Sequence, residues 1–249
     1  MMSGFMQICR MDFKNMLKSP VLIGYNTLFF FLIVLIMGFL NSGAYQHASN
    51  AYLYYTVTFL GYGILNGAMT ATNIFMERDI KKANLRIIHS PVGSFPIYFS
   101  KIVTSCVFNY LCHLLVLAAL VLLLHLDFDG THAGYLLLLM VPIEFAACAL
   151  GVLFCCVFKA EEGASTLLSN VIAIFAFLGG TFFSWDGMGG TMSLISKLSP
   201  VKWLNDTFFA ILVDGNLSSF LPVLGVSILT SVLLVFGCVK LFRTEDYVC

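Results

Sequence analysis

Between Ile102 and Leu126 the chain reads IVTSCVFNYLCHLLVLAALVLLLHL, without one Asp, Glu, Lys or Arg residue. At about 1.5 Å per residue, a helix of this length crosses the roughly 30 Å hydrocarbon core of a bilayer. The stretch therefore predicts a membrane-spanning helix.

The rest of the chain repeats this pattern. The sequence of 249 residues is 59% hydrophobic and 10% charged and contains 24 Phe, whereas a soluble domain carries about 25% charged residues. One soluble domain could not bury that much apolar surface, so we expect a single all-α membrane domain over residues 1–249 with six transmembrane helices. Besides Ile102–Leu126, the predicted spans are Val21–Leu40, Tyr54–Met76, Tyr135–Phe158, Ser165–Ser184 and Phe220–Leu241.

Basic residues gather on one side of these six stretches. Only Lys197 and Lys202, of the 13 Lys and Arg residues, fall on the other side. Basic loops stay in the cytosol, so the pattern predicts a multi-pass protein of the cell membrane with both termini cytoplasmic. The residues that set this orientation are Arg10, Lys14, Lys18, Arg78, Lys81, Lys82, Arg86, Lys101, Lys159, Lys240 and Arg243.

Three segments outside the spans carry structure of their own. Residues 3–18 predict an interfacial helix on the inner leaflet, with a simple cytosolic tail as the alternative. Residues 77–101 form the longest cytosolic connection. Residues 185–219 are too apolar for a solvated loop, and predict two short re-entrant helices in the outer leaflet, Thr191–Leu198 and Val201–Leu212, broken at Ser199-Pro200.

Several kinds of chemistry find no support in the sequence. The chain contains no GxxxxGK[ST], HExxH or GxSxG motif, so energy must come from a gradient or from another subunit. None of its eight cysteines lies in a segment assigned to the outer face, and Cys155-Cys156 lacks metal-ligand spacing. We therefore expect no disulfide, no metal site and no cofactor bound by this chain.

The connection that begins at Glu77 is the most informative local stretch. Acidic Glu77 and Asp79 precede a basic run, and the Ser90-Pro91 pair ends the pattern. These features predict a short helix that stops before the proline. Such a helix either docks into a cytosolic partner or serves only as a positively charged loop that sets topology.

Three stretches resemble the ABC-2 family of transporter permeases. In chain order they are Glu77-Arg78-Asp79 followed by Leu85 and Ser90-Pro91, similar to "ERE…L…SP"; residues 177–183, similar to "xLSGxxFP"; and Leu198-Ser199-Pro200, similar to "LxP". The sequence departs from the pattern at Asp79, which replaces Glu, and at Ser184-Trp185, where a proline is common.

The resemblance implies a function and partners. The segment at Glu77, Arg78, Asp79, Leu85, Ser90 and Pro91 would contact a separate ATP-binding cassette subunit, which would hold ATP and Mg. The chain itself would be a non-enzymatic permease subunit, paired with a second permease subunit in a homodimer or heterodimer. It would contact membrane lipid, bind no nucleic acid, and export a hydrophobic or amphipathic compound such as an antibiotic, a peptide or a lipid-linked molecule. The first, second and fifth spans would line the path.

Polar residues inside the predicted spans are candidate functional groups. His113 and Glu144 lie at matching depth in consecutive antiparallel spans, where a charge is costly, and this placement allows a hydrogen bond between them. Their role is either a structural bond between helices or, as the functional alternative, a proton relay or a polar contact with substrate. The remaining candidates for a substrate path are Asn66, Thr70, Asn73, Asn170, Gly179 and Gly180, whose polar members could instead cross-link helices.

Two other functions fit the sequence. An intramembrane enzyme would use His113 and Glu144 without ATP, and a membrane immunity or scaffold protein would sequester a toxin without transporting it. Copurification of a stimulated ATPase subunit would separate the transporter from both.

Overall fold

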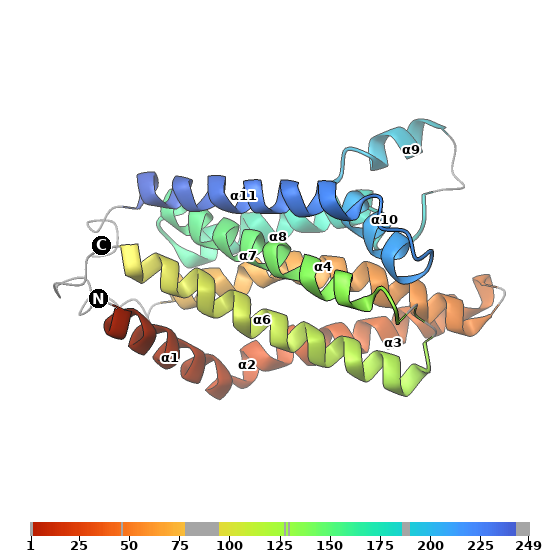
Figure 1. The fold of residues 1–249 in the computed structure, drawn as a ribbon, viewed down its shortest axis with the longest axis horizontal. Helices are drawn as coiled ribbons and strands as arrows, with labels where there is room; N and C mark the ends of the chain where they lie inside the picture. The colour runs from red at the N-terminus through yellow and green to blue at the C-terminus, as the bar shows by residue number, and fades with distance from the viewer. Residues whose placement is uncertain are drawn as a thin grey trace.

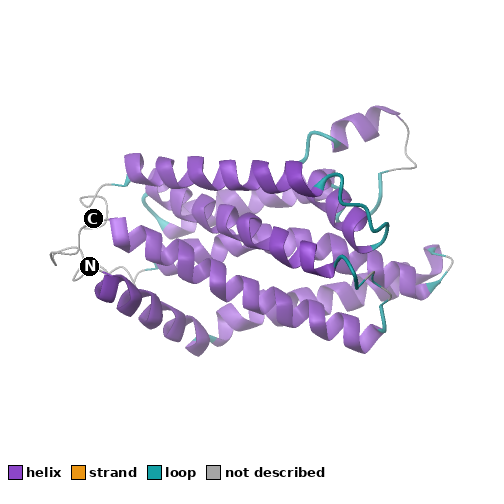
Figure 2. Cartoon of the chain, in the orientation of Figure 1, coloured by secondary structure: helices purple, strands orange, loops and turns teal. Residues whose placement is uncertain are grey.

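A computed structural model describes residues 2–45, 47–77, 95–126, 128, 130–185 and 190–242, and every regular element in them is helical. Figure 2 shows these helices and their short connections. The elements are α1 (Met2–Lys18), α2 (Pro20–Ile23), the π-helical segment η1 (Gly24–Phe29), α3 (Phe30–Asn41), the short 3₁₀ turn η2 (Ser42–Ala44), α4 (Ala48–Met76), α6 (Phe95–Leu124), α7 (Ala133–Phe158), α8 (Glu161–Leu178), α9 (Gly190–Ser196), α10 (Pro200–Leu212) and α11 (Phe220–Leu241).

Five helical stretches in the described residues are long and apolar enough to cross a membrane. They are Pro20–Ala44, Phe95–Leu124, Ala133–Phe158, Glu161–Leu178 and Phe220–Leu241. The chain is thus a multi-pass membrane protein, and the predicted sixth span, Phe220–Leu241, is reproduced residue for residue. Other predicted boundaries differ from the helices, most of all at α6 and α8: α6 already begins at Phe95, inside the predicted segment 77–101, and α8 runs from Glu161 to Leu178 instead of from Ser165 to Ser184.

The predicted second span, Tyr54–Met76, lies within α4 but is not among these five apolar stretches. The reason is its position. α4 lies at the centre of the bundle and packs against α3, α6, α7, α8 and α10. A helix surrounded by protein can carry polar side chains such as Asn66 and Thr70, both of which are buried.

Small residues let α4 and α7 pack closely. A Cβ added at Gly151 of α7 would lie 2.3 Å from the Ala68 carbonyl oxygen of α4. A Cβ added at Gly67 of α4 would likewise lie 2.5 Å from the Asn109 side-chain nitrogen of α6 and 3.1 Å from Glu144 Oε2 of α7. Glycine permits these backbone approaches because it has no Cβ.

Residues 3–18, the predicted interfacial segment, lie within the helix α1. α1 runs beside α6, and the Phe5 and Phe99 rings stack with centroids 6.0 Å apart. Ser19 caps α2 by accepting a hydrogen bond from the Leu22 backbone N–H (3.4 Å), and Pro20 occupies the first helical turn. α1 begins and α11 ends at the same end of the bundle, the left in Figure 1. We call this the near end, and the opposite end, which carries α10, the far end.

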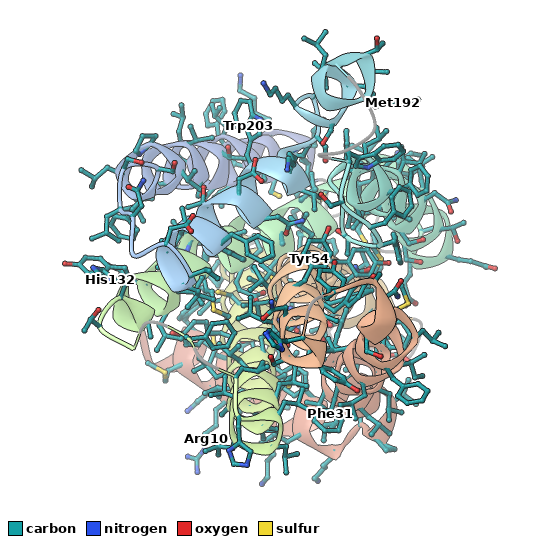
Figure 3. The ribbon with its side chains drawn as sticks, turned by 90° about the vertical axis from the view of Figure 1, so that its right-hand side faces the viewer. Arg10, Phe31, Tyr54, His132, Met192 and Trp203 are labelled. Atoms are coloured by element: carbon teal, nitrogen blue, oxygen red, sulfur yellow. The ribbon has the colours of Figure 1, made fainter. Side chains whose placement is uncertain are left out.

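The segment between α8 and α11 also contains the two short helices expected, α9 and α10. The buried face of α10 includes Leu204, Phe208 and Ile211 and packs into the bundle. α9 stands away from the bundle (Figure 1), and Met192 lies at the periphery in the view from the far end (Figure 3). Leu198, just after α9, is 78% exposed.

The cysteines of the described residues are all free. Each is buried except Cys9, which is partly exposed on α1.

Candidate functional site: a polar groove between three spans

A groove of about 320 Å³ opens between the start of the first span, α4 and α8. Hydroxyl, amide and carboxylate groups line much of it. Its lining residues are Val21, Leu22 and Tyr25 from the first span, Met69, Thr70, Thr72 and Asn73 from α4, and Glu161, Ser165, Thr166 and Ser169 from α8.

Two hydrogen bonds connect the first span to α4 at this groove. The Tyr25 hydroxyl donates to Asn66 Oδ1 (3.2 Å), and Asn26 Nδ2 donates to Thr70 Oγ1 (2.9 Å). Both residues of the first span lie in the π-helical segment η1. π-Helical turns are rare and occur frequently at functional sites. Sequence reasoning missed this segment because no residue pattern distinguishes it from an ordinary apolar helix.

A third polar contact connects α4 to α8. Asn73 Nδ2 donates to Glu161 Oε1 (2.9 Å), which places the Glu161 carboxylate at the near end of the groove. The sequence did not single out Glu161, since a carboxylate in a short turn between two spans resembles an ordinary solvated residue.

The predicted path residues are only partly brought together. Thr70 and Asn73 line the groove, and Asn66 lies beneath Tyr25. Asn170 is exposed on α8 outside the groove lining. Gly179 and Gly180 follow the last turn of α8, toward the far end, in a separate small pocket of about 50 Å³.

The chain after α8 enters the bundle without helical structure, and side chains satisfy its carbonyl groups. Tyr54 of α4 donates to the Gly180 carbonyl oxygen, and Asn205 of α10 donates to that of Gly179 (3.2 Å). Gly180 has φ of +78°, a conformation that favours glycine. Irregular backbone within a membrane protein persists only where protein groups satisfy it. Figure 3 shows Tyr54 near the middle of the bundle.

Tyr55 and Thr58 extend this arrangement by one turn. The Tyr55 hydroxyl donates to the Phe182 carbonyl oxygen (3.1 Å), and the Thr58 hydroxyl donates to that of Thr181 (3.1 Å). The two predicted glycines therefore belong to a structural connection between α4, α8 and α10.

A buried ion pair connects α1 to α6 at the near end. Lys101 Nζ lies 2.6 Å from Asp12 Oδ1, and the Lys101 side chain is 1% exposed. Burial raises the pKa of Asp12, and the Lys101 ammonium opposes that shift. Asp12 Oδ2 has no hydrogen-bond partner in the described part of the chain, and Asp12 lines a pocket of about 100 Å³ together with Asn73 and Glu77.

Of the predicted partner-coupling residues, the structure describes only Glu77. Its backbone N–H donates to the Asn73 carbonyl oxygen (2.8 Å) at the end of α4. The other coupling residues, Arg78, Asp79, Leu85, Ser90 and Pro91, lie outside the described residues.

The predicted intramembrane residues lie together: His113 Nδ1 and Glu144 Oε1 are hydrogen-bonded between α6 and α7, and Glu144 is fully buried. The pair lies apart from the polar groove. A cavity of about 10 Å³ beside His113 is otherwise lined almost entirely by apolar side chains. That volume accommodates at most one water, so the geometry favours a structural role. No group of three His, Cys, Asp or Glu residues that could hold a metal occurs in the described ranges.

Comparison with known proteins adds one finding. A family model described as ABC-2 type transporter matches residues 3–213, from α1 through α10. Among curated proteins, none matches the sequence.

Proposed function

The chain belongs to the ABC-2 type transporter family, whose role is transmembrane transport, and from this premise we propose that it is the permease subunit of an exporter driven by a separate ATPase subunit. The observation that carries the proposal is the polar groove between the first span, α4 and α8. A hydrophilic lining on the side of an apolar bundle is costly unless it faces water, a ligand or another protein.

We propose a topology of six spans in one membrane domain. α4 would be the additional span, since its 29 residues exceed the length needed to cross the bilayer and its polar groups face other helices. Both termini would be cytoplasmic, in agreement with the common end of α1 and α11 (Figure 1) and with the basic residues of α1. α1 would lie at the inner leaflet, since its exposed face carries Met6, Met11 and Leu17.

Two permease subunits, identical or related, would face each other across their grooves. The substrate would be a hydrophobic or amphipathic compound, such as an antibiotic, a peptide or a lipid-linked molecule. It would pass between the subunits, in contact with Asn73 and Tyr25.

Coupling to ATP would occur at the near end. The partner subunit would bind ATP and Mg, and would contact the segment from Glu77 to Pro91. Support comes from the position of Glu77 at the end of α4, the helix that contacts more of the bundle than any other in the described part. A displacement there would reach the groove through Asn73, which lies one helical turn before Glu77.

The proposal is tested by coexpressing the chain with a candidate ATP-binding cassette subunit from the same genome. We expect the two to copurify, and Glu77→Lys or Asp79→Lys to leave membrane insertion and ATP hydrolysis in place while transport falls about tenfold. The matched control is Glu162→Lys, an exposed carboxylate at the same end, which should transport normally.

If ATP hydrolysis drove transport at the wild-type rate in both Glu77→Lys and Asp79→Lys, the segment from Glu77 to Pro91 would not be the contact with the ATPase subunit. A chain that binds a toxin tightly with no ATPase partner would favour the immunity function instead.

A further inference from the structure

The groove presents hydrogen-bond acceptors and few donors, because most of its donors already bond within the protein. The Tyr25 hydroxyl donates to Asn66, and one Asn73 amide hydrogen is directed to Glu161. Two further hydroxyls that solvent can reach donate to backbone carbonyl oxygens: Ser165 to Glu162 (3.2 Å) and Ser169 to Thr166 (2.9 Å). A hydroxyl whose hydrogen is used still has lone pairs that can accept.

The charge of the groove has one sign. Glu161 is the only acidic or basic side chain in its described lining. Only one Glu161 oxygen accepts from Asn73, so the second remains for a ligand. Glu77 extends the negative charge toward the near end, through the pocket that shares Asn73 with the groove. Lys101, the one buried Lys or Arg residue in the described part of the chain, is already paired with Asp12.

Three residues of the lining are apolar. Val21 and Leu22 form one wall and Met69 lies opposite on α4. A ligand that fills the groove therefore meets acceptors and negative charge at the near end and hydrocarbon beside them.

We infer that the groove selects amphiphiles whose head group is a cation with N–H donors, a primary ammonium or a guanidinium, attached to an apolar body. The inference rests on the proposed function, since it names the substrate class of that same groove. An anionic head would face Glu161 at the cost of like-charge repulsion. A quaternary ammonium would gain the charge but leave the acceptors without donors.

The test uses the full-length chain in lipid nanodiscs and three probes with the same tail: dodecylamine, dodecyltrimethylammonium and dodecyl sulfate. Binding of radiolabelled dodecylamine is measured against empty nanodiscs, and the other two compete below their micellar concentrations. We expect dodecylamine to bind tightest and dodecyl sulfate about tenfold or more weaker, as charge-assisted hydrogen bonds require.

Substitutions assign the effect to the groove. Glu161→Gln keeps an acceptor for Asn73 but removes the charge, and should weaken dodecylamine binding about tenfold. Glu162→Gln, on the next residue and outside the lining, should change it less than about twofold. Thr166→Lys places a base at an exposed lining position, so it should weaken dodecylamine and strengthen dodecyl sulfate even if Glu161→Gln fails to fold.

Equal binding of dodecylamine by wild type, Glu161→Gln and Thr166→Lys would overturn the inference. So would tighter binding of dodecyl sulfate by wild type, or an absence of any binding by a complex that copurifies with its ATPase and hydrolyses ATP. In each of these results the proposed function itself would stand, whereas failure to associate with any ATPase would contradict the proposed function alone.

Discussion

Asp12 and Lys101 show at the scale of single residues how this chain fixes α1. A buried ion pair seldom adds net stability compared with apolar residues of the same volume, because both charges lose their hydration. Removing one partner is much worse, since it leaves the other charge buried alone. The pair therefore serves mainly to fix the position of α1 along α6, and adds little net stability.

Lys101→Met should lower the free energy of unfolding by about 3–5 kcal/mol, because Asp12 would remain buried without a counter-charge. Adding Asp12→Leu should restore most of that loss. Thermal unfolding of the purified chain in detergent measures all three proteins.

Lys14→Met is the control, since Lys14 is exposed on the same helix two residues from Asp12. Its midpoint should match wild type. If Lys101→Met unfolded at the wild-type temperature too, the pair would not be the anchor of α1.

The two buried pairs differ in how far the sequence predicted them. His113 and Glu144 were paired correctly because two ionisable groups at equal depth in adjacent apolar helices have few other partners. The pairing of Asp12 with Lys101 was not predicted, because Lys101 lies near the end of an apolar run and was interpreted as a cytosolic base. Only the packing of α1 on α6 buries it.

At the scale of elements, Ser199 joins two helices. Its hydroxyl caps α10 by accepting from the Val201 N–H (3.2 Å) and also donates to the Phe175 carbonyl oxygen of α8 (2.6 Å). The Gly179 N–H donates to that same carbonyl (2.7 Å). The end of α8 and the start of α10 are thus held together through one acceptor.

Ser199→Ala should destabilise the chain by about 1–2 kcal/mol, since it removes a cap and a bond between helices. The measurement is the midpoint of urea unfolding, followed by the fluorescence of Trp185 and Trp203. Ser219→Ala is matched to it, because Ser219 precedes α11 but makes no capping bond through its side chain. A shift of equal size in both variants would show that the Ser199 contacts contribute nothing specific.

Elements were predictable where hydropathy alone decides them. α11 faces the surroundings along most of its length, so its apolar run and its helix coincide. α8 stops early because Gly179 and Gly180 turn the chain into the bundle, where α4 supplies donors that the local sequence does not reveal. The groove was missed for a similar reason, since its residues are far apart in sequence.

At the scale of the whole molecule, the connections alternate between two ends. Those between α2–α3 and α4, between α6 and α7, and from α8 to α11 lie at the far end, whereas α7 turns into α8 at the near end, where α1 begins and α11 ends (Figure 1). Once one end of the bundle is assigned to the cytoplasmic side, the orientation of every spanning helix in the membrane is fixed.

An epitope inserted after Gly130, in the exposed turn between α6 and α7, should be cleaved by protease added to intact cells, because the proposed topology places it outside. The same epitope at the N-terminus should be cleaved only after permeabilisation. Immunoblotting measures both. Cleavage of the N-terminal epitope in intact cells would reverse the proposed orientation and place the expected ATPase contact on the wrong side.

Every described thiol except that of Cys9 is buried, which makes this chain convenient for chemical crosslinking through an introduced cysteine. Polar maleimides react with thiolates that water can reach, and a thiol packed between helices stays inert. Replacing Cys9 and Cys249 by serine would leave the buried thiols silent to such reagents. A single cysteine introduced at Thr166 could then be crosslinked to the same cysteine of a neighbouring subunit by a bifunctional maleimide. The shortest crosslinker that reacts would measure how closely two copies approach.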